Sequence, residues 1–261
     1  MSALAPRPSP LVPHPSPLAP PSIYVGIDDT DVLGSPGTNK LARHLVRSLA
    51  GDYESVLAVR HQLLFDPRIP YTSKNSSACL LFKSPEDLAT REGANDLATK
   101  IRALMADWFV PGSDPGLCVA TAVPDDIVQF GRRCQTEIVT QEDARRLAAQ
   151  HGLYLEGLDG TEDGVIGALA AVGLLFGGGD GRVVNIGHWP DDLSGPVDIE
   201  VLHARGVEVR HIETQEPIRS GRIDVGKHLR PAYRGGQIVL FVAPASEDSC
   251  PATCWQAVRL T

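Results

Sequence analysis

The sequence predicts a mixed fold, α/β or α+β, and three observations support this prediction. Hydrophobic residues make up 43% and charged residues 21% of the 261 residues, which is ordinary for a soluble globular protein. In the first half, short apolar runs of strand length alternate with helical patterns. In the second half, strand-like runs are more frequent. That mixture indicates an α/β or α+β architecture.

Residues 1–22 predict a disordered Pro-rich tail. They contain eight prolines among Ser, Ala and Leu, and proline cannot take part in helix or sheet hydrogen bonding in the ordinary way. Proline also interrupts each short apolar run, so the segment is not a secretory signal. We therefore expect that removing this tail leaves thermal stability almost unchanged.

Apolar spacing places the ordered elements that follow. Residues 23–27 are apolar and β-branched, which predicts a buried strand. Residues 38–49 predict a helix, with leucines four apart on one face and Thr38 as N-cap. The other expected helices lie at 85–109, 126–133, 141–150 and 165–176, and the other expected strands at 55–65, 77–82, 117–122, 182–186, 197–202, 207–212 and 237–242.

Charge and cysteine content restrict the classes of partner. The formal net charge is −8, whereas nucleic-acid binders usually carry a basic face. No apolar run approaches the roughly 20 residues needed to cross a bilayer. The five cysteines are scattered and odd in number, unlike a disulfide framework. We expect a cytoplasmic protein without a membrane partner that binds a small ligand, or a nucleotide held with metal.

Three carboxylates follow the first strand: Asp28, Asp29 and Asp31. In open α/β sheets, ligands bind beyond the carboxyl ends of strands, which suits a site here. Crowded like charges cost free energy unless something offsets them. Mg²⁺ prefers such hard oxygen ligands and usually brings substrate phosphates. We therefore assign these residues to metal binding and catalysis; a solvated acidic turn is the alternative.

A Gly-rich loop, residues 34–37, enters the expected helix. Free N–H groups and the positive end of the helix dipole suit a phosphate, although the spacing is not that of a Walker A loop. Thr38 is either an N-cap or a phosphoryl acceptor, and the residues alone favour the cap. Lys74, in a polar loop, is either a phosphate clamp or a solvated lysine. The residues assigned to nucleotide binding are Thr30, Gly34, Ser35, Gly37, Asn39, Lys74 and Asn75.

Weaker candidates have simpler interpretations. His61 in a strand is more often packed than a base. The acidic side chains of Asp159, Glu162 and Asp163 and of residues 191–192 either add a metal ligand or, more simply, belong to surface turns. Residues 177–180, three glycines and an aspartate, either bind a phosphate or, more simply, end a helix. A basic stretch is either a solvated face or a surface for an anionic substrate; its members are Arg219, Arg222, Lys227, Arg230 and Arg234.

These motifs resemble a known family. Residues 26–31, GIDDTD, followed seven residues later by Thr38, are similar to the GIDDTDS-x-x-G-M-C-T-T opening of the archaeal 2-agmatinylcytidine synthetases that modify an isoleucine tRNA. Residues 69–78 resemble the family's IPYKTRGNGA segment, and residues 164–173 its GLIGALAAIG segment. Residues 113–117 resemble its S-N-P-G-V turn. The resemblance covers residues 23–186.

The resemblance implies ATP and Mg²⁺ as cofactors, aspartates that hold the metal, and phosphorylation of the motif threonine at Thr38. It implies a kinase-like catalytic domain with a ferredoxin-like domain. We accordingly expect a tail at 1–22, a nucleotide- and Mg²⁺-binding domain at 23–112, a ferredoxin-like domain at 113–245 that either follows the first or is interleaved with it, and a C-terminal tail at 246–261. The resemblance implies an ATP-dependent ligase-like or phosphoryl-transfer enzyme whose acceptor is a small amine, a nucleoside or RNA.

The chain departs from the family at several positions. Gly37 stands where the family has Cys, and Asn39 where it has a second Thr. Residues 75–77 replace Gly-Asn-Gly, and Asp163 stands where the family has Arg. From the length of 261 residues we expect the family's OB-fold and zinc-ribbon modules to be missing. We therefore expect the ATP-handling half of the activity to carry over better than the tRNA half.

Two other functions stay open. A phosphatase or phosphotransferase of the haloacid dehalogenase type uses the motif D-x-D-x-[TV] after a buried strand. Asp29 and Asp31 supply the two aspartates of this motif, but Leu33 stands where the motif requires Thr or Val. The chain could also be a module that has lost catalytic activity and only binds nucleotide, metal or a partner.

Overall fold

The computed structural model describes residues 22–30, 37–70, 74–83, 90–108, 110–245 and 255–259. The expected tail at 1–22 lies outside these residues except for Ser22, which begins the first strand. Asp31, Gly34 and Ser35 also lie outside them, as does most of the expected C-terminal tail. None of the described helices has the length and apolar character needed to cross a membrane.

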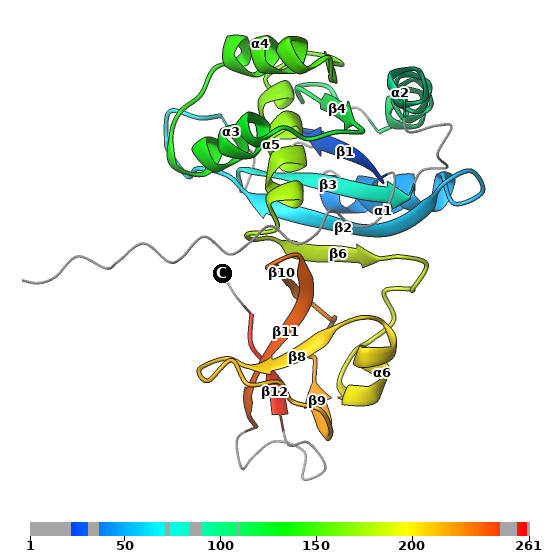
Figure 1. The fold of residues 1–261 in the computed structure, drawn as a ribbon, viewed down its shortest axis with the longest axis vertical. Coiled ribbons are helices and arrows are strands. Elements are labelled where there is room, and N and C mark those ends of the chain that lie inside the picture. Colours follow the sequence, from blue (N-terminus) through cyan, green and yellow to red (C-terminus); the bar gives the residue numbers. More distant parts are fainter. Residues whose placement is uncertain are drawn as a thin grey trace, which may run out of the picture.

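The first part of the chain supplies six neighbouring strands of one longer sheet, in the order β5-β4-β1-β3-β2-β6 (Figure 1). The neighbouring strands all pair antiparallel. The strands are β1 (Ser22–Asp28), β2 (Glu54–Gln62), β3 (Ser76–Lys83), β4 (Gly116–Ala120), β5 (Tyr154–Gly157) and β6 (Arg182–Ile186). β1 lies in the interior of this sheet, and five of its residues are buried on alternating faces because both faces are covered.

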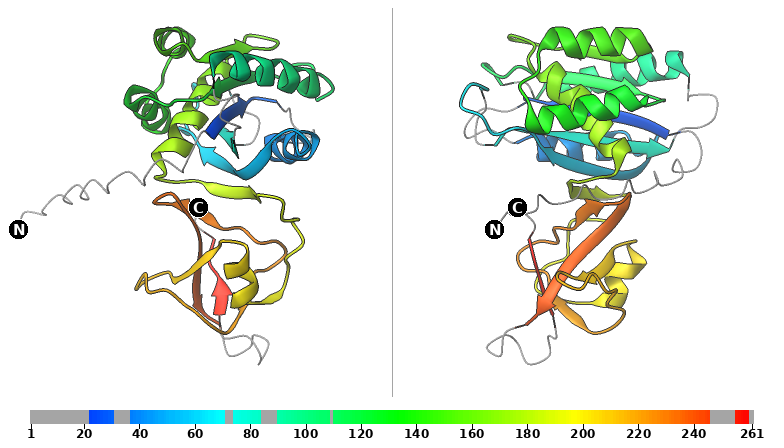
Figure 2. Two further views of the ribbon diagram at one scale, coloured as in Figure 1. Left: turned by 45° about the vertical axis from the view of Figure 1, so that its right-hand side comes forward. Right: turned by 60° about the vertical axis from the view of Figure 1, so that its left-hand side comes forward.

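Helices cover both faces of this sheet and make three layers (Figure 2). α1 (Thr38–Ser48) and α2 (Arg91–Ala106) pack on one face through Leu and Ile side chains. α3 (Asp125–Thr136), α4 (Gln141–His151) and α5 (Gly164–Gly177) lie on the other face. The helix at 38–49 and the small-residue helix at 165–176 are confirmed within one residue at each end.

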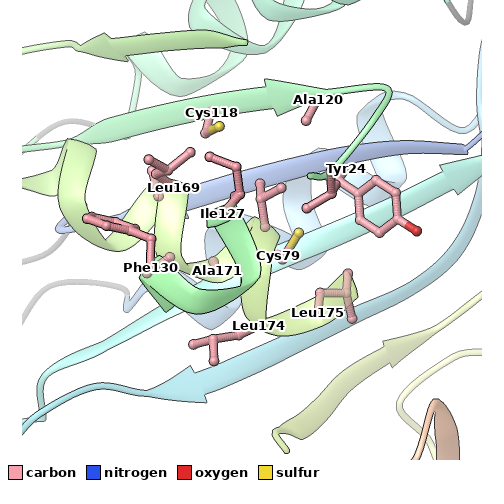
Figure 3. Packing of buried hydrophobic residues seen from close by; sticks show 14 of the residues in the cluster. Tyr24, Cys79, Cys118, Ala120, Ile127, Phe130, Leu169, Ala171, Leu174 and Leu175 are labelled. Atoms are coloured by element: carbon pink, nitrogen blue, oxygen red, sulfur yellow. The ribbon is translucent and has the colours of Figure 1, made fainter. Parts of the chain in front are cut away.

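α5 lies between α3 and the sheet (Figure 3). Nearly all of its side chains are buried, because strands contact one side and α3 the other. Glycines make this close approach possible. A methyl group on Gly26 of β1 would overlap the carbonyl oxygen of Ala168, and one on Gly116 of β4 would overlap the backbone of Gly164. Backbone contacts backbone here, which fixes α5 against β1.

The last part of the chain forms a smaller β-rich body below the first (Figure 1). β10 continues the sheet from β6 through one register pair, Ala232 with Arg182. A separate apolar cluster, which includes Ile199 and Leu240, holds this body together. Its elements are β7 (Pro196–Asp198), α6 (Ile199–Ala204), β8 (Glu208–His211), β9 (Arg222–Asp224), β10 (Ala232–Arg234), β11 (Gln237–Pro244) and β12 (Trp255–Ala257).

The expected mixed α/β class is confirmed, but the expected strand at 197–202 is wrong. The strand β7 stops at Asp198, and Ile199–Ala204 is helix α6. Ile199 and Leu202, three residues apart, are both buried, which is helical spacing. The expected domain boundary at residue 112 falls between α2 and β4, within one sheet, and the division into domains stays a prediction.

Candidate nucleotide site

A cavity of about 230 Å³ opens where β1 ends, beside the first turn of α5 and the end of α3. We call it the acidic cavity, because its lining includes four carboxylates: Asp28, Asp29, Glu137 and Asp163. Arg68 and Lys74 add positive charge. The apolar part of the wall consists of Leu63, Ile69, Pro70, Ile138, Val139 and Ile166. The cavity thus combines hard oxygen ligands, a lysine and an apolar wall of the kind that accommodates a ring.

The position of Asp28 depends on a glycine of α5. Asp28 ends β1, and a methyl group on Gly167 would overlap its Oδ2 atom. The carboxylate therefore lies directly against the first turns of α5. The N-terminal end of a helix carries partial positive charge, which stabilises a carboxylate placed there. Close packing of α5 on β1 thus positions the first candidate ligand.

Asp29 has a left-handed backbone conformation, with φ of 47°. Few residues other than glycine adopt this conformation, although Asp does so more readily than most. Such conformations cost free energy and cluster at functional sites. The turn at Asp29 ends β1 so that both neighbouring carboxylates, Asp28 and Asp29, line the same cavity.

The opposite wall comes from the connection between β2 and β3. Lys74 is exposed and lines the cavity, as does Asn75. The Asn75 amide donates to the carbonyl oxygen of Leu64 over 2.8 Å, so this side chain also holds its own loop. Arg68 donates to both carboxylate oxygens of Asp66, which lowers the pKa of Asp66 to about 2. Lys74 is therefore the better placed cation for a phosphate.

Cys134 of α3 also lines the cavity, but its thiol is not a nucleophile. Burial raises its pKa to about 12; the charge of Arg133 opposes this rise, and the charge of Asp28 adds to it. The thiol stays protonated at neutral pH, whereas a cysteine nucleophile reacts as thiolate. Cys134 contributes shape to the wall rather than chemistry.

Thr38 has a different local role from the expected N-cap. Gly37 is the N-cap of α1, without a side-chain hydrogen bond, and Thr38 is the first helical residue. The Thr38 hydroxyl accepts a hydrogen bond of 3.3 Å from the buried Thr30 hydroxyl. Neither threonine lines the acidic cavity, and neither does Gly37 or Asn39. Asn39 Oδ1 is buried and has no hydrogen-bond partner among the described residues.

The expected aspartate cluster is described only in part, since Asp31 lies outside the described residues together with Gly34 and Ser35. Within the described part of the chain, no three His, Cys, Asp or Glu side chains are close enough to hold a metal by themselves. Asp28 and Asp29 are nevertheless brought to one cavity. The assignment of the three aspartates to a metal stays a prediction.

Two carboxylates of the cavity were not assigned to it from the sequence. Asp163 was interpreted as part of a surface turn, yet it precedes α5 and accepts a 2.6 Å hydrogen bond from Gln141. Glu137 follows α3 and has no sequence signal, because only the packing of α3 on α5 brings it near β1. His61 is fully buried, as expected of a packed histidine. Gly178 ends α5 in a left-handed conformation, as expected of a helix stop.

Comparison with known proteins agrees with the resemblance in the motifs. No protein-family model matches the chain. The isoleucine-tRNA 2-agmatinylcytidine synthetase TiaS of Cenarchaeum symbiosum (strain A) is 24% identical over 185 residues. The chain is similar to TiaS. The match covers 66% of this chain and 40% of TiaS, so the chain spans about two fifths of that protein's length.

Two solved structures share the fold. The crystal structure of TiaS in complex with its isoleucine tRNA and ATP matches 59% of this chain and 36% of that chain, with a TM-score of 0.50 and 20% identity. The crystal structure of a tRNA fluorescent labeling enzyme matches 58% of this chain and 36% of that chain, with the same TM-score and identity. The mixed α/β fold is therefore common to TiaS and this chain.

Proposed function

We propose that this chain is an ATP- and Mg²⁺-dependent enzyme of the TiaS kind, which activates an acceptor by phosphoryl transfer or ligation. The observation that carries the proposal is the acidic cavity, where Asp28, Asp29 and Lys74 meet an apolar wall. Asp28 and Asp29 belong to the GIDDTD segment that resembles the family motif. The structure of TiaS with its isoleucine tRNA and ATP supports ATP as the nucleotide.

The side chains present fit Mg²⁺. Proteins usually hold Mg²⁺ through one or two carboxylates together with substrate phosphates, so Asp28 and Asp29 are sufficient on the protein side. Asp31 is the expected third ligand. Bound there, the ion would neutralise charge on the transferring phosphoryl group.

The protein's own residues would supply binding and orientation. The apolar wall, which includes Ile69 and Ile138, accommodates the base. Lys74 attracts the phosphates as a point charge from the opposite side. Thr38, the proposed phosphoryl acceptor, does not line the cavity, and its role is supported by the motif alone. The acceptor of the complete reaction is a small amine, a nucleoside or RNA.

The test is ATP consumption with and without Mg²⁺ across a panel of amines and nucleosides. We expect Asp28→Asn and Asp29→Asn each to abolish Mg²⁺-dependent ATP use while the fold survives, and Asp31→Asn to do the same. Asp96→Asn, an exposed carboxylate on α2, is the matched control and should keep full turnover. Wild-type turnover in the Asp28 and Asp29 variants would defeat the proposal.

The chemical state of the protein after ATP use separates the alternatives. Phosphate on Thr38 supports the TiaS-like reaction, whereas a phosphoaspartate trapped on Asp29 supports the haloacid dehalogenase type. Nucleotide binding without any turnover would support a binding module instead. Mass spectrometry of protein quenched during turnover distinguishes the three outcomes.

A further inference from the structure

β6, at the edge of the first part of the chain, meets β10 of the smaller β-rich body (Figure 1). A second cavity, of about 220 Å³, is lined by residues of both strands. We call it the arginine pocket. Its basic lining residues come from β2, β6, β10 and the segments beside β10 and β12, and they are Arg60, Arg182, Arg230, Arg234 and Arg259, with Lys74 at the edge. The chain as a whole has a net charge of −8, so this concentration of positive charge is a local feature of the fold.

Within the described residues, the charge of Asp180 acts on Arg234 and that of Asp191 on Arg230, which leaves the five arginines of the lining in excess. Arg182, Arg230 and Arg259 form no ion pair with any described carboxylate. Asp180 is the one carboxylate of the described lining, and it is engaged by His61 over 3.3 Å and by Gln135 over 2.7 Å. The Nε atom of Arg182 is buried without a hydrogen-bond partner among those residues.

The clustered arginines repel one another. Burial lowers the pKa of Arg182 to about 10, and the charges of Arg60 and Arg230 contribute to this fall. Burial likewise lowers the pKa of Arg230, although the charge of Asp191 opposes this fall. Like charges held together and partly removed from water cost free energy that a bound anion offsets. This unfavourable free energy is concentrated in the arginine pocket, which is typical of a binding site rather than of a solvated face.

The shape and donors of the pocket select the kind of anion. Guanidinium groups present planar pairs of N–H donors that match phosphate oxygens, and several arginines around one cavity can contact one phosphate from different sides. Lys74 lines both the arginine pocket and the acidic cavity. We propose that the arginine pocket binds a phosphate group of a ligand other than the nucleotide, next to the nucleotide cavity. This goes beyond the proposed function and does not depend on ATP use.

The test is calorimetric titration of the full chain with inorganic pyrophosphate in the presence of EDTA, which removes metal-dependent binding. We expect the double variant Arg230→Ala, Arg259→Ala to bind pyrophosphate at least about tenfold more weakly, because each arginine supplies charge-assisted hydrogen bonds. Arg219→Ala is the matched control: it lies in the same basic stretch, is exposed and does not line the pocket. The control should bind like wild type.

Two further measurements distinguish phosphate binding in the arginine pocket from ATP use at the acidic cavity, and identify the source of the phosphate. Asp29→Asn should lose ATP use but retain pyrophosphate binding. A short oligouridylate that displaces pyrophosphate, with affinity falling steeply with salt, indicates the backbone of a nucleic acid strand; binding of pyrophosphate alone indicates a small phosphorylated compound. Absence of binding by both probes, or binding unchanged in the double variant while its melting temperature is that of wild type, would overturn the proposal.

Discussion

The two faces of the main sheet are covered by helices in different ways. α1 and α2 contact their face through large side chains such as Leu45, Leu97 and Ile101. α5 contacts the other face backbone to backbone, because Gly26 and Gly116 have no side chain to separate them. On the first face, neighbouring side chains can rearrange when one of them is replaced. On the second face, the contacting atoms belong to the backbone and cannot rearrange in this way. The candidate site lies on the second face, where Asp28 meets Gly167.

The largest effect is expected from Gly26→Ala. The added methyl group would overlap the carbonyl oxygen of Ala168, and this atom belongs to a buried helix backbone that cannot rotate away. We expect a loss of about 3 kcal/mol or more in the free energy of unfolding, measured by urea denaturation. Gly51→Ala, where nothing lies within 4 Å of the added methyl, should change stability little. Equal effects at both positions would refute the tight contact.

A smaller, graded effect is expected on the other face. Leu97 of α2 is fully buried, and Leu97→Ala should cost about 2–5 kcal/mol through lost burial and the remaining cavity. Leu104, also on α2 but only partly buried, should cost clearly less when replaced by alanine. The same denaturation experiment measures both. If Leu104→Ala were the more destabilising, the assignment of the packed face of α2 would be wrong.

The smallest effect on stability is expected from Gly167→Ala, which should act on the site instead. Its methyl group would overlap the end of the Asp28 side chain, which can rotate aside. We expect a stability loss of about 1 kcal/mol and a fall in ATP turnover of about tenfold or more, because misplaced groups lose catalytic efficiency. Gly179→Ala, where nothing lies within 4 Å of the added methyl group, is the control and should keep wild-type turnover. Equal turnover in the two variants would contradict the role of the contact between Gly167 and Asp28.

The sequence predicted the elements around the candidate site better than the contacts between them. β1, its terminal aspartates and α5 follow from apolar runs and small residues, which are local signals. The acidic cavity lies beyond the carboxyl end of β1, as expected, but β1 pairs antiparallel with both neighbours, and the contact of α5 with β1 places Asp28 there. Glu137 and Cys134 could not be found, because packing of α3 alone brings them to the cavity. The N-cap was missed because Gly37, without a side chain, has that role.

Lys74 borders both cavities, and this has a consequence for inhibitor design. A single compound with a planar ring in one cavity and a phosphate tail in the other would place its linker beside the same ammonium group. Such a compound would compete with both proposed ligands at once, and its potency would be greatest where the length of the linker matches the distance between the two cavities.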